Sequence, residues 1–275
     1  MKISRLFSAG LVSLGLLLAA QQVAAFGAHG HRIVAQICEN HLTPKAAAEI
    51  SKITGGQYLA QLATWPDEIR SDPGWSWTMP WHYLSINDDE SFADFPRNSE
   101  GDVWSALKRF EKQLRARQKK DEDGITLKQA LAFYIHFVGE IHQPLHVGRR
   151  DDYGGNGIAV KWFGEDSNLH KVWDTGLINH EMLSFREYAD FLNQAQAQQM
   201  HVWQQSTYLD WARESRAART RVYDFGSQNT GTIVPELGYS YVFRNRDLIR
   251  ERLLKSGVRL ASMLNDIFDT KASPE

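Results

Sequence analysis

Hydrophobic and polar positions alternate with a helical period along most of the chain. Hydrophobic residues recur every three or four positions within residues 102–118, where Val103, Leu107, Phe110 and Leu114 share one face. The same period predicts further helices over residues 32–41, 127–142, 184–199, 201–221 and 235–268. The pattern is therefore typical of an all-α protein.

Capping residues mark the ends of several of these segments. Thr43 followed by Pro44 is typical of an N-cap and of the first helical residue after it. Thr126 is placed to cap the helix over residues 127–142. Pro144 should end that helix, because proline lacks the amide hydrogen that a helix interior needs. These signals support the helical interpretation.

Glycines gather in residues 149–164 around a short β-prone run at residues 158–162. Such a run between turn residues predicts a short β-hairpin. No internal repeat and no low-complexity linker divides the chain. We therefore expect a single, mainly helical domain with this hairpin as a minor β element.

The N-terminal segment differs from the rest of the chain. Lys2 and Arg5 precede an apolar run at residues 11–20, and small residues follow at 23–25. This order is typical of a cleaved secretory signal peptide and is too short for a permanent membrane anchor. It predicts a signal peptide that ends at residue 25 and a secreted or periplasmic protein that begins at Phe26.

Composition narrows the classes of function. Hydrophobic residues make up 43% of the 275 residues and charged residues 23%, which is ordinary for a globular domain. Removing the two basic residues of the signal peptide from the 31 Lys and Arg leaves 29 against 33 Asp and Glu, a formal charge of −4. No bulk basic charge therefore indicates nucleic-acid binding. After the signal peptide, no stretch approaches the roughly 18 apolar residues of a membrane span.

Cysteine and histidine usage points towards metal binding. Cys38 is the only cysteine, which excludes an intrachain disulfide, whereas ten histidines are present. We expect one domain over residues 26–269, followed by a frayed tail at residues 270–275.

Two histidine–acid pairs lie at the spacing of one helical turn. His136 and Glu140 are four residues apart within an apolar helix, and His170 and Asp174 repeat the spacing. Paired imidazole and carboxylate groups suit a divalent metal, with zinc the leading candidate. Such pairs are also common on helix surfaces, so a single pair would carry little weight. His142 lies off the ligand face, and we expect it to support the ligands from behind.

Weaker signals lie upstream. Asp67 and Arg70 are one turn apart, and His82 stands between aromatic residues that include Tyr83. His31 closes a Gly-x-x-Gly-His stretch directly after the predicted cleavage site. Each has an ordinary structural alternative: a helix cap, a surface salt bridge, a core histidine or a core aromatic residue.

In this order the motifs resemble those of the S1/P1 nucleases, the trinuclear-zinc single-strand nucleases whose fold is shared with zinc phospholipase C. The matching blocks lie at residues 26–31, 65–70, 81–83, 136–146, 154–160 and 168–174. Six ordered blocks over the whole mature chain are a specific signal, although each alone is weak.

The resemblance implies three zinc ions per chain. The implied ligands are Asp67, His82, His136 and Glu140 for one ion, His146, His170 and Asp174 for a second, and His31, Glu140 and the main chain of Phe26 for the third. The α-amino ligand of Phe26 would exist only after the signal peptide is removed.

The resemblance also implies an activity and its residues. A zinc-bridged hydroxide would hydrolyse phosphodiester bonds of single-stranded DNA and RNA to 5′-phosphate products, with 3′-nucleotidase activity as well. Arg70, Asp67 and Glu140 would have catalytic roles, and Arg70, Tyr83 and Asn168 would contact the substrate. Nucleic acids and nucleotides are the implied partners; we expect no stable protein partner, no membrane span and a monomer.

Four positions depart from the family pattern. Phe26 replaces a tryptophan, but its implied ligand atoms belong to the main chain, so ligation should survive. Glu140 replaces a bridging aspartate, and its extra methylene should affect metal spacing and rate more than fold. Ser85 replaces a base-contacting acid, and Glu165 replaces a tyrosine of a second nucleotide site, so neither base preference nor that site is carried over. A zinc phospholipase C-type phosphodiesterase and a non-catalytic extracytoplasmic zinc-binding protein stay open as alternatives.

Overall fold

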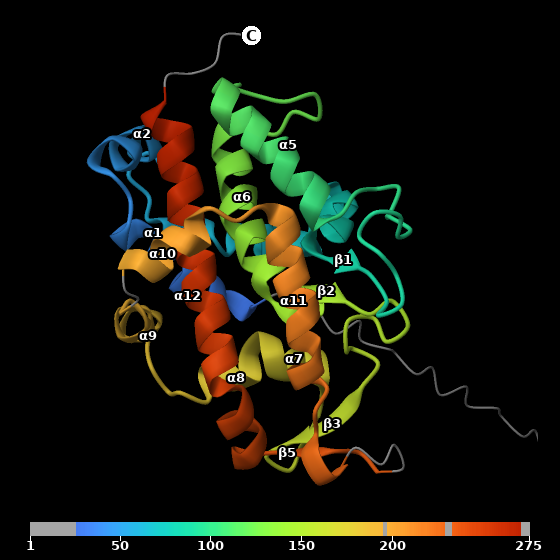
Figure 1. The fold of residues 1–275 in the computed structure, drawn as a ribbon. Coiled ribbons are helices and arrows are strands. Elements are labelled where there is room, and N and C mark those ends of the chain that lie inside the picture. Colours follow the sequence, from blue (N-terminus) through green and yellow to red (C-terminus); the bar gives the residue numbers. More distant parts are fainter. Residues whose placement is uncertain (1–25, 195–196, 229–232, 271–275) are drawn as a thin grey trace, which may run out of the picture.

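The computed structural model describes residues 26–194, 197–228 and 233–270. The predicted signal peptide and residues 271–275 of the predicted tail therefore lie outside the described residues. The described part is mainly helical, as expected (Figure 1).

The helices and strands follow in chain order. The α-helices are α1 (Gly27–Asn40), α2 (Pro44–Thr54), α3 (Leu59–Leu62), α4 (Trp65–Glu68), α5 (Val103–Ala116), α6 (Leu127–His142), α7 (Leu169–Lys171), α8 (Leu177–Asn179), α9 (Phe185–Leu192), α10 (Ala197–Gln204), α11 (Tyr208–Val222) and α12 (Tyr239–Asp269). The tighter 3-10 segments are η1 (Ile69–Ser71), η2 (Pro73–His82), η3 (Pro144–His146) and η5 (Gly226–Gln228), and η4 (Val172–Gly176) is a π-helical turn. The strands are β1 (Leu84–Ser85), β2 (Val147–Gly148), β3 (Ala159–Trp162), β4 (Glu165–Asn168) and β5 (Glu236–Leu237).

Helix α6 runs through the centre of the molecule. It begins at a capping box in which Thr126 and Gln129 exchange hydrogen bonds, and it ends at His142, just before the predicted stop at Pro144. Every residue in 130–142 is buried, so the helix is enclosed on all sides. Helices α1, α5, α11 and α12 pack around it (Figure 1). Side chains on opposite faces of α6 therefore enter different buried environments.

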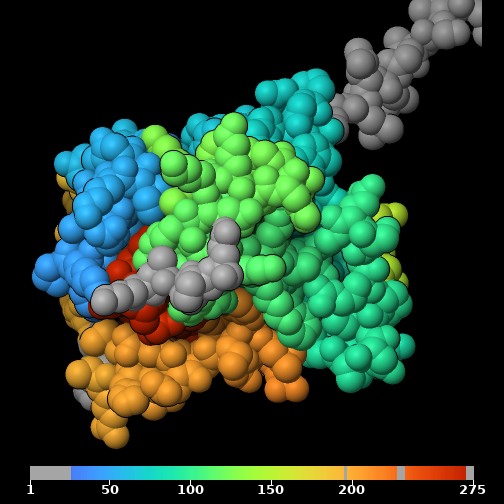
Figure 2. All heavy atoms as spheres, turned by 90° about the horizontal axis from the view of Figure 1, so that it is seen from above, coloured from blue at the N-terminus to red at the C-terminus, as the bar shows by residue number. Residues whose placement is uncertain are grey.

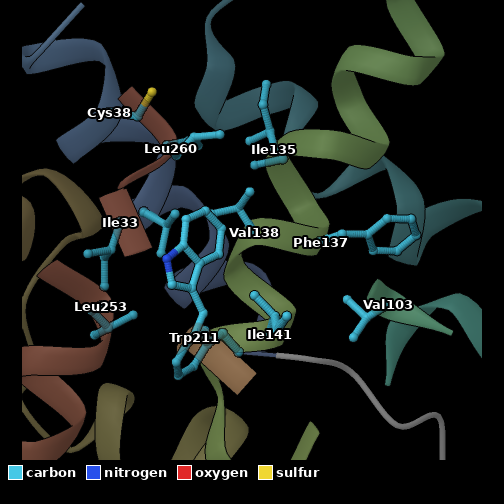
Figure 3. Packing of buried hydrophobic residues seen from close by; sticks show 14 of the residues in the cluster. Ile33, Cys38, Val103, Ile135, Phe137, Val138, Ile141, Trp211, Leu253 and Leu260 are labelled. Carbon is cyan, nitrogen blue, oxygen red and sulfur yellow. The ribbon is translucent and has the colours of Figure 1, made fainter. Parts of the chain in front are cut away.

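The core between these helices is closely packed. Trp211 of α11 lies among aliphatic side chains that include Ile33 of α1, Val138 and Ile141 of α6, and Leu253 of α12 (Figure 3). Interiors of this kind resist small displacements, because neighbouring side chains interlock. This packing gives α6 a fixed position relative to the C-terminal helices.

Helix α12 closes the domain on one side. Seen from above, its C-terminal end lies between α2 and α10 (Figure 2), and both of these helices contact it. Thr43, the N-cap of α2, donates a hydrogen bond from its hydroxyl to Asp269 at 2.8 Å. The start of α2 is thereby held against the end of α12.

Two small sheets bring loop segments to the site. Strands β1 and β2 pair in parallel, so that the segment after His82 lies beside the segment after His146. Strands β3 and β4 form the predicted antiparallel hairpin. Strand β5 adds a parallel third strand to β3, which the sequence pattern did not predict. The β1–β2 pair therefore joins two histidine-bearing segments that are far apart in the sequence.

Four predicted helices have wrong boundaries. The helix predicted over residues 32–41 begins already at Gly27. The helix predicted over residues 184–199 ends at Leu192, and α10 follows it. The helix predicted over residues 201–221 is broken before Thr207, which starts α11 with its own capping box. The helix predicted from residue 235 begins only at Tyr239, because the residues before Gly238 pair with β3 instead. Within the described residues, no helix combines the length and hydropathy needed to span a membrane.

Candidate metal centre

A first group of donor atoms gathers from three separate elements. Asp67 comes from α4, His82 from the last residue of η2, and His136 and Glu140 from one face of α6. One ligand atom from each lies within 4.8 Å of the others. The predicted members of the first zinc site therefore come together.

A second group lies beside the first. His146 ends η3, His170 lies on α7, and Asp174 lies on the π-helical turn η4. His170 Nε2 is 3.0 Å from Asp174 Oδ2, and His146 Nε2 is 3.5 Å from Asp174 Oδ1. Donors around a tetrahedral zinc ion are separated by roughly 3.3 Å, given zinc–ligand distances of about 2.0–2.1 Å. The spacing in this group suits such an ion.

The Glu140 carboxylate lies between the two groups. Its Oε1 is 2.7 Å from His136 Nε2, and its Oε2 contacts the Nδ1 atom of His146. Glu140 itself is fully buried. The resemblance implies that Glu140 is shared by the first and third ions, and its Oε1 does lie near histidines of both sites, 2.7 Å from His136 Nε2 and 3.8 Å from His31 Nε2.

Four of the histidines use Nδ1 in the same way. In each, Nδ1 lies within hydrogen-bond distance of a main-chain carbonyl oxygen, which can only accept. The pairs are His136 with Ala63 at 2.8 Å, His82 with Thr78 at 3.2 Å, His146 with His82 at 3.0 Å, and His170 with Gly154 at 2.6 Å. Each Nδ1 therefore carries the hydrogen, and each Nε2 presents a lone pair, which is the arrangement of metal-ligating histidines.

The resulting lone pairs face one another. His146 Nε2 and His170 Nε2 are 3.0 Å apart, and two imidazoles that both carry their hydrogen on Nδ1 have none left to place between them. The Nε2 atoms of His82 and His136 are buried without a hydrogen-bond partner, as are both oxygens of Glu140. Buried polar atoms of this kind are costly unless a partner satisfies them. A divalent cation in each group fits this donor set.

His31 lies next to the first group. Its ring stacks on His136 with centroids 3.8 Å apart, and its Nε2 is 3.8 Å from Glu140 Oε1. Both ring nitrogens are buried and lack a hydrogen-bond partner. Phe26, fully buried, is the N-cap of the same helix, α1. Two of the three predicted members of the third site, Phe26 and His31, thus lie at the start of α1, and His31 lies beside the carboxylate of the third member, Glu140.

Burial and neighbouring charges set the protonation of these groups. Burial, reinforced by the nearby His136, lowers the pKa of His82 to about 3. Burial raises the pKa of Asp67. Burial would also raise the pKa of Glu140, but the surrounding His146 and His136 outweigh it and hold that pKa well below its usual range. Burial would lower the pKa of His136 and His146, but the neighbouring carboxylates outweigh it and raise both. Neutral imidazole and ionised carboxylate are the forms that bind metal, so a cation binding here would displace protons.

Arg70 is attached to a candidate ligand. Its Nη1 donates to Asp67 Oδ1 at 3.0 Å, and its Nε points at the sulfur of Met79 at 3.1 Å. The alternative of a surface salt bridge does not describe this pair, since the side chains of Arg70 and Asp67 are only 10% and 16% exposed. Arg70 is therefore fixed beside the first metal group.

Both metal groups open onto one cavity. The cavity has a volume of about 610 Å³, and its wall includes His82, His146, His170, Arg70 and Tyr83. Tyr83 is 42% exposed, so its ring is accessible to a ligand and is not a core aromatic residue. The candidate metal groups, the candidate stacking residue and a guanidinium thus face the same space.

Asn168 and Gln143 hold parts of the second donor group in place. Asn168 is the N-cap of α7, where its side chain accepts a hydrogen bond from the Lys171 amide at 2.8 Å; it is not among the residues that line the cavity. Gln143 donates to Asp174 Oδ1 at 2.6 Å and accepts from the Leu145 amide at 2.6 Å. We assigned no role to Gln143 from sequence, although it lies in the block between Glu140 and His146.

His142 points away from both metal groups. Its Nδ1 lies 2.7 Å from the Val138 carbonyl oxygen, and its Nε2 lies 3.0 Å from Arg259 Nη1. Its ring lies against Trp211, on the α11 side of α6. His142 therefore contacts the main chain of its own helix, α6, and does not contact the candidate metal ligands.

Comparison with known proteins agrees with this geometry. The sequence model of the S1/P1 nucleases matches residues 26–269. The chain is 30% identical to Endonuclease 4 of Arabidopsis thaliana, over 90% of each chain. It is 29% identical to Nuclease P1 of Penicillium citrinum, over 88% of this chain and 97% of that protein. It is 27% identical to Nuclease S1 of Aspergillus oryzae, over 92% of this chain and 96% of that protein. The family model covers almost all of the described chain, and the donor groups and the cavity agree with it. The chain therefore belongs to the S1/P1 nuclease family, and with it to the hydrolases of phosphodiester bonds.

Proposed function

We propose that this protein is an extracytoplasmic zinc-dependent endonuclease that cleaves single-stranded DNA and RNA to 5′-phosphate products and also removes the phosphate from 3′-nucleotides. The observation that carries the proposal is the shared wall of the cavity. Histidines of both donor groups, a fixed arginine and an exposed tyrosine face the same volume. Such a combination suits a phosphate group with an attached base.

Charge supports metal ions as the partners of the phosphate. Three arginines line the cavity, and each is already paired with a carboxylate: Arg70 with Asp67, Arg97 with Asp102, and Arg150 with Glu90. Their positive charge is therefore largely neutralised within the chain. A polyanion entering this cavity would need additional positive charge, which divalent cations in the two donor groups supply.

The residues that would hold the zinc ions are those of the two groups, together with His31 and the main chain of Phe26 for a third ion. Bound zinc would supply Lewis-acid stabilisation of phosphate charge and a water molecule acidic enough to be deprotonated near neutral pH. The carbonyl acceptors behind the four Nδ1 atoms keep their Nε2 lone pairs directed at these positions.

Arg70 would stabilise the phosphate as its charge changes. Its guanidinium is held by Asp67 and has further N–H groups available at the cavity wall. Such a group, fixed before the substrate arrives, needs no reorganisation during the reaction. Asp67 therefore has two tasks, as a donor of the first metal group and as the anchor of Arg70.

Tyr83 would select single strands. A base can stack on its exposed ring only when that base is not stacked and paired in a duplex. Replacement of Tyr83 by alanine should raise KM for a short single-stranded oligonucleotide by about 5- to 150-fold, which corresponds to the roughly 1–3 kcal/mol of a base–aromatic stack. Tyr83→Phe, which keeps the ring, is the matched control and should retain the wild-type KM.

The decisive experiment uses protein that begins at Phe26. Zinc content is measured by elemental analysis, and hydrolysis is followed on matched single-stranded DNA, single-stranded RNA, duplex DNA, 3′-nucleotides and phosphatidylcholine vesicles. We expect three zinc ions, activity that a chelator abolishes and zinc restores, single strands cleaved faster than duplex, and 5′-phosphate ends.

Other outcomes would overturn the proposal. Full zinc loading without hydrolysis of any nucleic acid would identify a non-catalytic zinc-binding protein. Faster hydrolysis of phosphatidylcholine than of oligonucleotides would identify a phospholipase C-type enzyme. Equal rates on single-stranded and duplex DNA would remove the role assigned to Tyr83.

A further inference from the structure

The last turn of α6 carries Glu140, and helix ends have a general weakness. The final carbonyl groups of a helix lack a partner within the helix, so the last turn is its least constrained part. In α6 the carbonyl of Glu140 itself accepts a hydrogen bond from the Gln143 amide at 3.0 Å. The neighbouring carbonyls are bound by side chains of α11 and α12.

Three side chains bind these carbonyls directly. Ser215 donates to the Ile141 oxygen at 2.6 Å, and Arg252 Nε donates to the His142 oxygen at 2.9 Å. Ser256 donates to the Val138 oxygen at 3.1 Å. All three donors are buried. The end of α6 is thus fixed from two other helices at once.

One acid organises the donors. Glu214 accepts from Arg252 Nη1 at 2.6 Å and from Arg259 Nη1 and Nη2 at 2.8 and 2.7 Å. Arg252 Nη2 also donates to Ser215 Oγ at 2.7 Å. Arg252 and Arg259 are only 2% and 1% exposed, so their guanidinium groups cannot turn away into water.

His142 connects the second arginine to the same turn. A guanidinium can only donate, so the 3.0 Å contact makes Nε2 of His142 the acceptor of Arg259. The hydrogen of the neutral ring is then on Nδ1 and is donated to the Val138 carbonyl. Arg259 therefore acts on the last turn of α6 through His142.

Stability alone is a poor explanation for this arrangement. Buried ion clusters are often no more stabilising than well-packed apolar side chains of the same volume, because the charges must be desolvated. What the cluster supplies is directional contact with the carbonyls of Val138, Ile141 and His142 around the last turn of α6. That turn presents Glu140 to histidines of both metal groups, with a 2.7 Å contact to His136. A shift of a few tenths of an ångström would spoil the contact, since metal–ligand distances tolerate about 0.2 Å.

We propose that Arg252, held by Glu214, is a positioning residue that fixes the bridging carboxylate of Glu140 from the opposite side of α6. The proposal rests on the proposed zinc-dependent function of the donor groups. Arg252 touches neither metal ligand atoms nor the cavity, so it would act only through the main chain of α6.

The test compares Arg252→Met with wild-type protein. Methionine keeps most of the volume but removes the bonds to the His142 carbonyl, to Glu214 and to Ser215. We expect zinc affinity at the bridged site and kcat on a single-stranded oligonucleotide each to fall by about 10- to 100-fold. KM should change by less than about threefold, because Tyr83 and Arg70 are not displaced. Arg252→Lys, which keeps a charge and a donor, should recover part of both losses.

Arg117→Met is the matched control. Arg117 also binds main-chain carbonyls of two helices, those of Leu114 in α5 and Ile267 in α12, but it lies outside the cavity wall and the donor groups. Its replacement should lower the thermal unfolding temperature without changing zinc affinity or kcat. A purely structural Arg252 would behave in the same way.

The outcomes separate clearly. Folded Arg252→Met protein with wild-type zinc affinity and kcat would overturn the proposal. If that variant does not fold, the double variant Ser215→Ala, Ser256→Ala decides, since it removes two of the carbonyl bonds with little change of volume; unchanged zinc affinity would then refute positioning, and a reduction would support it. If wild-type protein binds zinc but hydrolyses no nucleic acid, the proposed function fails while the zinc-affinity comparison still tests Arg252.

Discussion

Gly139 tests the geometry of the third metal position directly. A Cβ atom at this position of α6 would lie 2.8 Å from His31 Nδ1 and 3.0 Å from its Cε1. Ordinary contacts begin near 3.4 Å, so Gly139→Ala should displace the His31 ring by about 0.6 Å, the difference between the two distances. That shift is roughly three times the about 0.2 Å that a metal–ligand distance tolerates.

The same substitution should change the stability of the fold much less than it changes zinc affinity. Alanine is favoured over glycine in a helix by about 1 kcal/mol, and no other atom within 4 Å is met by the new methyl group besides those of His31. Moving the buried His31 ring, which stacks on His136, costs about 1–3 kcal/mol and offsets this gain. We therefore expect Gly139→Ala protein to unfold at an equal or slightly lower temperature, while it loses affinity for one zinc ion by about 10- to 100-fold.

The assay is a competitive zinc titration with a chromogenic chelator, run beside calorimetric unfolding. Ala132→Gly, two turns earlier in the same helix, is the control: it should lower the unfolding temperature and keep all zinc affinities. Three zinc ions bound to Gly139→Ala protein with wild-type affinity would refute the placement of His31 at a metal.

Three further predictions follow from the site and its support. Arg70→Ala should lower kcat by about 100-fold with zinc content unchanged, since the guanidinium stabilises charge and is not a ligand; loss of zinc would show a structural role. Adding one residue before Phe26 should remove one zinc ion per chain and most activity, and an extended protein with full zinc content would contradict the role of its amino group. Burial opposes ionisation of Glu214, but its arginine partners outweigh this and lower its pKa from 4.5 to about 2. The ionised form therefore stabilises the fold fully above pH 4.5, and this stabilisation is lost as the pH falls towards 2. In urea unfolding, the stability difference between wild type and Glu214→Gln should be constant above pH 5 and narrow below pH 4.5; a constant difference down to pH 2.5 would contradict it.

Much of α6 could be predicted from the sequence. The capping residue Thr126, the apolar run and Pro144 mark its two ends, and the spacing of His136 and Glu140 places both on one face. Local signals sufficed because the helix is long, strongly periodic and capped at its start. The hairpin of β3 and β4 was predictable from another local signal, a short β-prone run between glycines that form turns.

Other parts depend on contacts that leave no local pattern. Strands β1 and β2 are two residues long each and pair across more than sixty positions, so no alternation announces them. The break before Thr207 could have been found, since Thr207 and Asp210 form a capping box that a longer helical period concealed. Hydrophobic periodicity alone predicts one helix over residues 201–221, which covers the end of α10 and most of α11.

The site shows the same division. Side-chain ligands were predictable because their chemistry is visible in the sequence, and the resemblance ordered them. Gln143, Arg252 and Glu214 were missed, because a buried amide or guanidinium looks like any surface polar residue until its partners are known. His142 was expected to support the ligands, and it does touch their helix, but through Arg259 and the Val138 carbonyl.

The carbonyl partners of the ligand histidines have a consequence for how this protein can change over generations. The acceptors belong to the peptide backbone, so most substitutions at Ala63 or Thr78 would alter a side chain and leave the acceptor in place. Gly154 is the exception, because its φ is positive, at 62°, and a Cβ atom added there would lie 2.5 Å from the Leu145 oxygen. The acceptors that orient the imidazoles are thus main-chain atoms, so a substitution that leaves the backbone in place also leaves each Nε2 directed inward.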